Sequence, residues 1–251
     1  MKESDKKRIA EEFRNCVLGT IRRIEEVDTY RPFHAALLSD EALFWSRFER
    51  SFSTSFGQRV VEEISKIVVL SGGATDASRQ KETEIAIDVA VDNAISDHIS
   101  TLRSGNRMNW IETLQSIDSI EKQGINAHQR VISDLWWKKN GIDHFMSIKT
   151  VKPNIDQTAV AKTDLLRLKL NDPACKVYFG LYYNPCGEDK ASYAFNPPKG
   201  IFDFANDSVV LIGRDYWDVL GGEGTYDTVL GIAREVGMET QVLLASLMDG
   251  S

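Results

Sequence analysis

The sequence predicts an α/β fold in which helices flank a mixed β-sheet and a helical region comes first. Two observations lead to this prediction. Up to about residue 125, apolar residues recur mainly at helical spacing. From residue 130, short apolar segments bounded by turn residues alternate with a helical pattern. We therefore expect an N-terminal helical region over residues 1–50 and a main domain over 51–251, continuous with the N-terminal helices.

Capping residues mark the expected helices of the first half. Helices are predicted after Ser4, from Gly57 to Leu70, and after Asn109, where Glu112 completes a capping box. The stretch TEIAIDVAVD, residues 83–92, is ambiguous because its apolar residues alternate as in a strand while the following residues keep helical spacing. We interpret it as helix.

Strands and helices alternate in the second half. Pro153 ends a strand, and Asn154 can cap a helix to about Leu170, with Gln157 at its third position. The segments KVYFGLYYN and SVVLIG read as buried strands. Two further helices are expected, around Tyr216 to Leu220 and from Thr225 to Val236.

Composition limits the class of protein. The chain has 251 residues and a net charge of −7, which argues against nonspecific coating of nucleic acid, a task of phosphate neutralisation by Lys and Arg. The charged N-terminus lacks the apolar run of a signal peptide, and no segment approaches a membrane span. We expect a cytoplasmic protein without a membrane partner. The cysteines, Cys16, Cys175 and Cys186, show no CxxC spacing and are expected to be reduced thiols.

The most informative segment is a hairpin over residues 132–149. Asn140-Gly141 between two apolar runs is a strong signal for a two-residue turn, because both residues tolerate positive φ. Lys139 then pairs with Ile142. The same register places Asp134 opposite Ser147, with Lys149 on the same face.

Asp134 and Lys149 together suggest phosphodiester hydrolysis. An aspartate can hold Mg²⁺ beside an ammonium group that positions the attacking water or stabilises the phosphorane. Mg²⁺ keeps several waters, so one or two carboxylates suffice. Asp143 has Lys138 as its register partner and is better explained as one half of an ion pair near the turn.

Three other polar residues near the hairpin have simpler explanations than catalysis. His144 is expected to be a packed or rim residue. Asp156 and Asp164, on the following helix, are most simply solvent-facing, although either can approach the site from the side.

The hairpin and the helix after it resemble the PD-(D/E)xK nuclease core. The segments RSFSTSFGQRVVEEISKI, SIKTVKPNIDQT, YFGLYYNP and LIGRDYWDVLGGEGTYDTVL further resemble the TdeIII-type group of type II restriction endonucleases, over roughly residues 50 to 237. The resemblance implies a Mg²⁺-dependent homodimer that cuts double-stranded DNA at a short, near-palindromic site, with a DNA methyltransferase encoded nearby. The group is associated with sites of the GGNCC kind, but the sequence itself does not give the site.

Two positions depart from the superfamily pattern. Ser133 replaces the proline, which is common. Ser147 replaces the second acid, and a neutral hydroxyl is a poor Mg²⁺ ligand, so another carboxylate is needed. The resemblance favours Glu62 on the helix before the sheet, with Glu63 beside it.

An acid from the helix after the lysine is the alternative, and Asp164 fits that position. The backbone carbonyl of Ile148 is a further candidate ligand. A solvated helix face explains Glu62 and Glu63 equally well.

Candidate DNA contacts follow the active strand. They are Lys152, Asn154, Gln157 and Lys162. A loop containing Arg103, Asn106 and Arg107 is a weaker candidate for reading bases.

The other hypotheses are a repair or junction-resolving nuclease of the same core, a DNA-binding protein that has lost catalysis, and an α/β scaffold with no role in nucleic-acid binding. The missing acid at Ser147 motivates the second of these.

Overall fold

The computed structural model describes residues 1–26, 31–195 and 200–249. The chain divides into two compact units. One, called here the helical unit, is Met1–Ile67 together with the segment from Asp227 onward, and the other, the sheet unit, is Val68–Tyr226. The predicted domains, 1–50 and 51–251, stay a prediction, and helix α3 (Asp40–Ser55) runs through the boundary between them.

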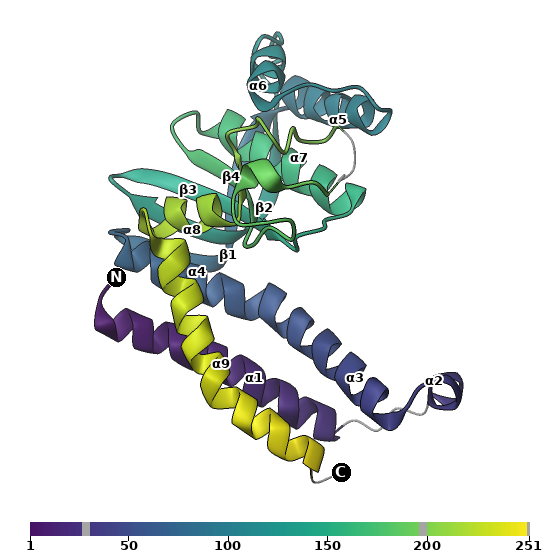
Figure 1. Ribbon diagram of the computed structural model, residues 1–251. Coiled ribbons are helices and arrows are strands. Elements are labelled where there is room, and N and C mark those ends of the chain that lie inside the picture. Colours follow the sequence, from purple (N-terminus) through teal and green to yellow (C-terminus); the bar gives the residue numbers. More distant parts are fainter. Residues whose placement is uncertain (27–30, 196–199, 250–251) are drawn as a thin grey trace. The chain divides into compact units, whose positions relative to one another are not determined.

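The sheet unit is built on a five-stranded mixed sheet in the order β1-β2-β3-β4-β5 (Figure 1). Strands β1 to β3 pair antiparallel, whereas β3, β4 and β5 pair parallel. The strands are β1 (Asp76–Asp88), β2 (Asn126–Lys139), β3 (Ile142–Lys149), β4 (Lys176–Leu181) and β5 (Val210–Ile212). This confirms the predicted α/β fold with a mixed sheet.

The β2–β3 hairpin has the register that the sequence predicts. Asn140 and Gly141 have φ angles of 53° and 77°, as a type I′ turn requires. Pairing runs from Lys139 with Ile142 to Leu135 with Met146. The sum of paired residue numbers stays constant, so the same register leads on to Asp134 and Ser147.

Helix α7 (Ile155–Asn171) packs on one face of the sheet. It begins with the predicted capping box, in which Asn154 and Gln157 each accept a backbone N–H of the other. Phe145, Phe179 and Leu165 belong to the apolar core on this side, and helices α5 (Val89–Arg103) and α6 (Trp110–Asp118) extend it. Figure 1 shows that α5 and α6 lie farther from the sheet than α7 does. The predicted capping box of Asn109 and Glu112 is also present.

Helix α8 (Arg214–Gly221) covers the opposite face at β4. A Cβ added at Gly180 would lie 2.7 Å from a ring carbon of Tyr216 and 3.0 Å from the sulfur of Met146. Because Gly180 has no side chain, the Tyr216 ring can lie directly against strand β4. A short 3₁₀ turn, η2 (Lys190–Ser192), lies between β4 and β5.

The interpretation of residues 83–92 as helix is wrong for the first part of the segment. Residues up to Asp88 form the end of β1, and α5 begins at Val89. Asp88 ends the strand and caps the helix. Its carboxylate accepts hydrogen bonds from the backbone N–H groups of Ala90 and Gly124. Ile85 and Ile87 alternate into the core as strand residues.

The helical unit contains α1 (Glu3–Glu26), α2 (Pro32–Leu37), α3, and a π-helical turn, η1 (Phe56–Val60), that leads into α4 (Val61–Ser71). Helix α9 (Thr225–Asp249) joins this unit from Asp227. The helix predicted from Gly57 is thus the continuation of α3 through η1. Among the described residues, each helix is too short or too polar to span a membrane.

His144 packs within the sheet unit, as expected. Its ring stacks on Trp137 at a centroid distance of 4.7 Å, and Tyr178 stacks on the same tryptophan. Burial, together with the nearby charges of Lys176 and Lys139, lowers the pKa of His144 to about 4, although Asp143 opposes this shift. The residue is therefore neutral in the folded state at physiological pH.

This burial predicts acid sensitivity at one position. The unfolded chain takes up the His144 proton near pH 6.5 whereas the folded chain resists it, so stability is lost as pH falls through this range. His144→Phe keeps the stacked ring and should remove this loss. Between pH of about 7.5 and about 5, urea unfolding should show the native chain losing about 2 kcal/mol more than the variant. Equal losses would contradict the assigned burial cost.

Candidate active site

The carboxylate of Asp134 is held against strand β3. Its Oδ2 accepts hydrogen bonds from Lys149 Nζ at 2.9 Å, Ile148 N at 2.6 Å and Ser147 Oγ at 3.3 Å. Among the described residues, its Oδ1 accepts one long hydrogen bond of 3.4 Å, from Gln80 Nε2. Oδ2 is therefore saturated, and Oδ1 is the oxygen left for a further ligand.

Lys149 forms a partly buried ion pair with Asp134. Besides the carboxylate, its Nζ donates to the carbonyl oxygen of Ile148 at 3.2 Å. The side chains of Lys149 and Asp134 are 24% and 20% exposed, so solvent screens the pair less than it would at the surface. The lysine and aspartate predicted from the hairpin register thus lie in direct contact.

Ser147 supports the aspartate. It donates a hydrogen bond to Asp134 Oδ2, and no second acid occupies its position. The departure from the PD-(D/E)xK pattern therefore remains at this point of the hairpin.

Gln80 approaches Asp134 from the third strand, β1. Neighbouring pairs, Arg79 with Leu135 and Lys81 with Ser133, place it opposite Asp134. Its φ of 47° is uncommon for a residue other than glycine, and strained backbone of this kind clusters at functional sites. This contact is not predictable from local sequence patterns, because residues 76–82 are mostly polar and lack the apolar alternation of a strand.

Asp164 on α7 is half-buried: 29% of its side chain is exposed, and its Oδ1 lies 4.0 Å from Arg167 Nη1. Burial raises the pKa of its carboxyl to about 6, while Arg167 and Lys149 lower it and Asp134 raises it. Asp164 therefore shares the electrostatic surroundings of Asp134 and Lys149. This supports the alternative in which the second acid comes from the helix after the lysine.

The oxygen donors of this site fit Mg²⁺. Within the part of the chain that the structure describes, no three His, Cys, Asp or Glu side chains form a metal-binding group. The available set is instead Asp134, Asp164 and the Ile148 carbonyl, which are all oxygens, and Mg²⁺ accepts few protein ligands and keeps waters. A bound cation would also favour the ionised form of the desolvated Asp164.

Glu62 and Glu63 lie on α4 in the helical unit. Glu62 is only 6% exposed, which excludes the solvated helix face as its explanation. Its role as a metal ligand, and that of Glu63, stays a prediction from the sequence.

The predicted DNA contacts divide into two groups. Lys152, Asn154 and Gln157 are exposed, and Lys152 lies over the ring of Phe195 with its Nζ 5.6 Å from the centroid. The prediction for Lys162 is wrong. Its side chain is 0% exposed, because its Nζ donates to the carbonyl of Ile201 at 2.6 Å in the interior.

Other charged residues have structural partners. Lys138 and Asp143 form the expected cross-strand ion pair at 3.6 Å, and Trp136 Nε1 also donates to Asp143. Asp156 is exposed and pairs with Arg103 at 2.7 Å. Base reading by Arg103, Asn106 and Arg107 stays a prediction.

The chain is similar to known restriction enzymes over nearly its whole length. Residues 1–237 match the family described as "Type II restriction endonuclease, HinfI". The type II restriction enzyme HgiCII of Herpetosiphon aurantiacus is 32% identical over 236 residues, covering 87% of this chain and 85% of the relative. The enzymes HgiBI and HgiEI of the same organism are each 32% identical over 237 residues, with the same coverage. No solved structure matches the chain.

These matches confirm the resemblance at the level of type II restriction endonucleases, and with it DNA as the substrate. The TdeIII-type assignment and the PD-(D/E)xK superfamily stay predictions. The chain belongs to the HinfI family of type II restriction endonucleases, which cleave DNA at specific sites.

Proposed function

We propose that the chain hydrolyses double-stranded DNA at a short, near-palindromic site in a Mg²⁺-dependent reaction, with its catalytic centre on the β2–β3 hairpin. One observation carries this assignment. Lys149 Nζ lies 2.9 Å from Asp134 Oδ2, while the half-buried carboxylate of Asp164 interacts electrostatically with both residues. An ammonium group beside two carboxylates is the equipment that phosphodiester hydrolysis needs.

Asp134, Asp164 and the Ile148 carbonyl would hold Mg²⁺. When bound, the ion would neutralise negative charge on the scissile phosphate and lower the pKa of a coordinated water. Oδ1 of Asp134 is the oxygen suited to this role, because Oδ2 already accepts three hydrogen bonds.

Lys149 acts on the phosphate or on the attacking water. Its ammonium is held in place by Asp134 Oδ2 and the Ile148 carbonyl, which leaves one of its three N–H donors for a substrate oxygen. Such a preoriented donor stabilises charge that develops on the phosphorane. Ser147 and the Ile148 N–H position the aspartate for both tasks.

The proposal also includes the more detailed properties that the family resemblance implies. A homodimer matches a two-fold DNA site, with each subunit cutting one strand. We include in the proposal a PD-(D/E)xK core of the TdeIII type and a recognition site of the GGNCC kind. We also expect a DNA methyltransferase gene nearby. An adjacent methyltransferase gene would identify a restriction-modification system.

The catalytic pair can be tested by substitution. Asp134→Ala or Lys149→Ala should lower plasmid cleavage with Mg²⁺ by at least about 100-fold, because each removes a group that acts in the transition state. Binding of the same DNA should survive. A matched control lies on the same hairpin: Lys138→Ala breaks the ion pair near the turn and should leave cleavage intact.

Other outcomes separate the alternatives. Discrete fragments from the native protein support a site-specific enzyme, whereas gradual degradation to small products would favour a repair or junction-resolving nuclease. A native protein that binds DNA and never cuts it, with Mg²⁺ or Mn²⁺, would identify an inactive DNA-binding member.

The second acid can be identified by comparing two conservative variants. We expect Asp164→Asn to reduce cleavage by about 10- to 100-fold and to raise the Mg²⁺ concentration needed, because it removes a ligand charge. Asp156→Asn, on the exposed side of the same helix, is the control. If Glu62→Gln remains folded and is the only variant that raises the Mg²⁺ concentration needed for cleavage, the second acid is Glu62 and not Asp164.

Lys152 should contribute a phosphate contact. Lys152→Ala should weaken duplex binding and reduce the slope of log affinity against log salt by about 0.9, the value for one phosphate contact. Lys122→Ala removes an exposed charge elsewhere in the sheet unit and should leave the slope unchanged. An identical slope for native protein and Lys152→Ala would remove Lys152 from the interface.

A further inference from the structure

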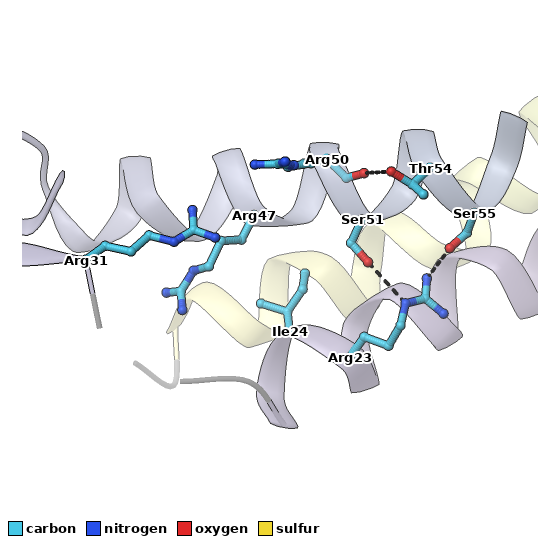
Figure 2. Close-up of a pocket in the computed structure, with 8 residues that line it drawn as sticks. All are labelled: Arg23, Ile24, Arg31, Arg47, Arg50, Ser51, Thr54 and Ser55. Atoms are coloured by element: carbon cyan, nitrogen blue, oxygen red, sulfur yellow. Dashed lines mark hydrogen bonds between the residues drawn. The ribbon is translucent and has the colours of Figure 1, made fainter. Parts of the chain in front are cut away.

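The helical unit contains a pocket lined by arginines (Figure 2). Its volume is about 440 Å³, within the range of roughly 300 to 1,000 Å³ typical of ligand pockets. Arg23 comes from α1, Arg31 precedes α2, and Arg47 and Arg50 come from α3. Nothing in the nuclease chemistry described above accounts for this cluster.

The arginines of the cluster have no carboxylate partner among the side chains that the structure describes. The arginines of this unit that do form ion pairs are Arg14, with Glu11 and Glu239, and Arg59, with Glu12. Four like charges around one pocket repel each other, so an anion bound there would relieve the repulsion.

The hydrogen-bonding groups of the pocket are arranged as donors. Arg23 donates to Ser51 Oγ at 3.1 Å and to Ser55 Oγ at 2.7 Å, as Figure 2 shows. The two serine oxygens accept from the guanidinium, and their own O–H groups have no acceptor among the described residues. Each serine therefore keeps a proton to donate to a ligand.

Arg47 and Arg50 are also available for a ligand. Arg47 uses its Nε on the carbonyl of Leu43 at 3.3 Å, which leaves both terminal nitrogens. Arg50 makes no side-chain hydrogen bond to another described residue and is exposed. Two guanidinium groups with free N–H donors suit bidentate binding of phosphate oxygens.

We propose that this pocket binds backbone phosphates of the DNA substrate, in addition to the phosphate at the scissile bond. The inference rests on the DNA substrate that family membership establishes. The described lining consists mainly of guanidinium and hydroxyl donors and contains no carboxylate. Such donors bind a phosphodiester through its oxygens and do not read its base sequence. Inorganic phosphate or a mononucleotide offers the same oxygens, so the test separates these sources.

A double substitution tests the proposal in the full-length protein. Arg47→Gln with Arg50→Gln removes two pocket charges and spares Arg23, which links α1 to α3. The matched control is Arg8→Gln with Arg234→Gln, two exposed arginines of the same unit that lie outside the pocket. Thermal unfolding of both variants should match that of the native protein.

Binding is read by fluorescence anisotropy with a labelled duplex of arbitrary sequence in EDTA. For the pocket variant, the slope of log affinity against log salt should become shallower by about 1.8, that is, two contacts of about 0.9 each, and affinity should fall by about ten-fold or more. The control variant should lose less than about two-fold. Equal effects of the two variants would overturn the proposal, because only net charge would then matter.

A second arm uses small anions. If inorganic phosphate or a 5′-mononucleotide stabilises the native protein and not the pocket variant, while both bind the duplex alike, the pocket is a small-anion site and the proposal fails. Asp134→Ala should lose cleavage yet keep the native salt slope. The proposed catalytic centre and this pocket can therefore fail independently.

Discussion

The register of the β2–β3 hairpin is the constraint on which the candidate active site depends. A slip of one residue would turn every side chain of one strand to the other face, separating Asp134 from Lys149. Asn140 and Gly141 fix this register because both accept positive φ. The parallel pairing of β3 with β4 then requires a crossover, and α7 in that crossover carries Asp164.

The candidate active site combines an ion-paired carboxylate with a second carboxylate whose ionised form is disfavoured by burial. Asp134 is paired with Lys149 and satisfied on one oxygen, whereas Asp164 is desolvated and its pKa is raised. Under the proposed function, a divalent cation would favour the ionised form of Asp164. The arginine pocket of the helical unit instead has an excess of hydrogen-bond donors that the proposed phosphate ligand would satisfy.

Local patterns predicted the parts of the structure that depend on neighbours in sequence. The turn and register of the hairpin and the capping boxes at Asn109 and Asn154 need only a few adjacent residues. Lys162 could not be placed in this way, because its burial depends on Ile201 and Phe202 from a later segment.

Distance along the chain explains the remaining errors. Residues 83–92 combine a strand end with a helix start, and the signal separating them was the cap at Asp88, whose partners include the distant Gly124. The arginine pocket is not predictable from local sequence, because Arg23 and Arg50 line one pocket only when α1 packs against α3. The π-helical turn η1 has a consequence of its own: it interrupts a long helix between Arg50 and Glu62. Such turns arise by insertion of one residue, and each residue rotates a helix by about 100°. A single insertion or deletion in η1 would therefore rotate Arg47 and Arg50 on α3 relative to Glu62 and Glu63 on α4, about the helix axis. It would change none of these side chains.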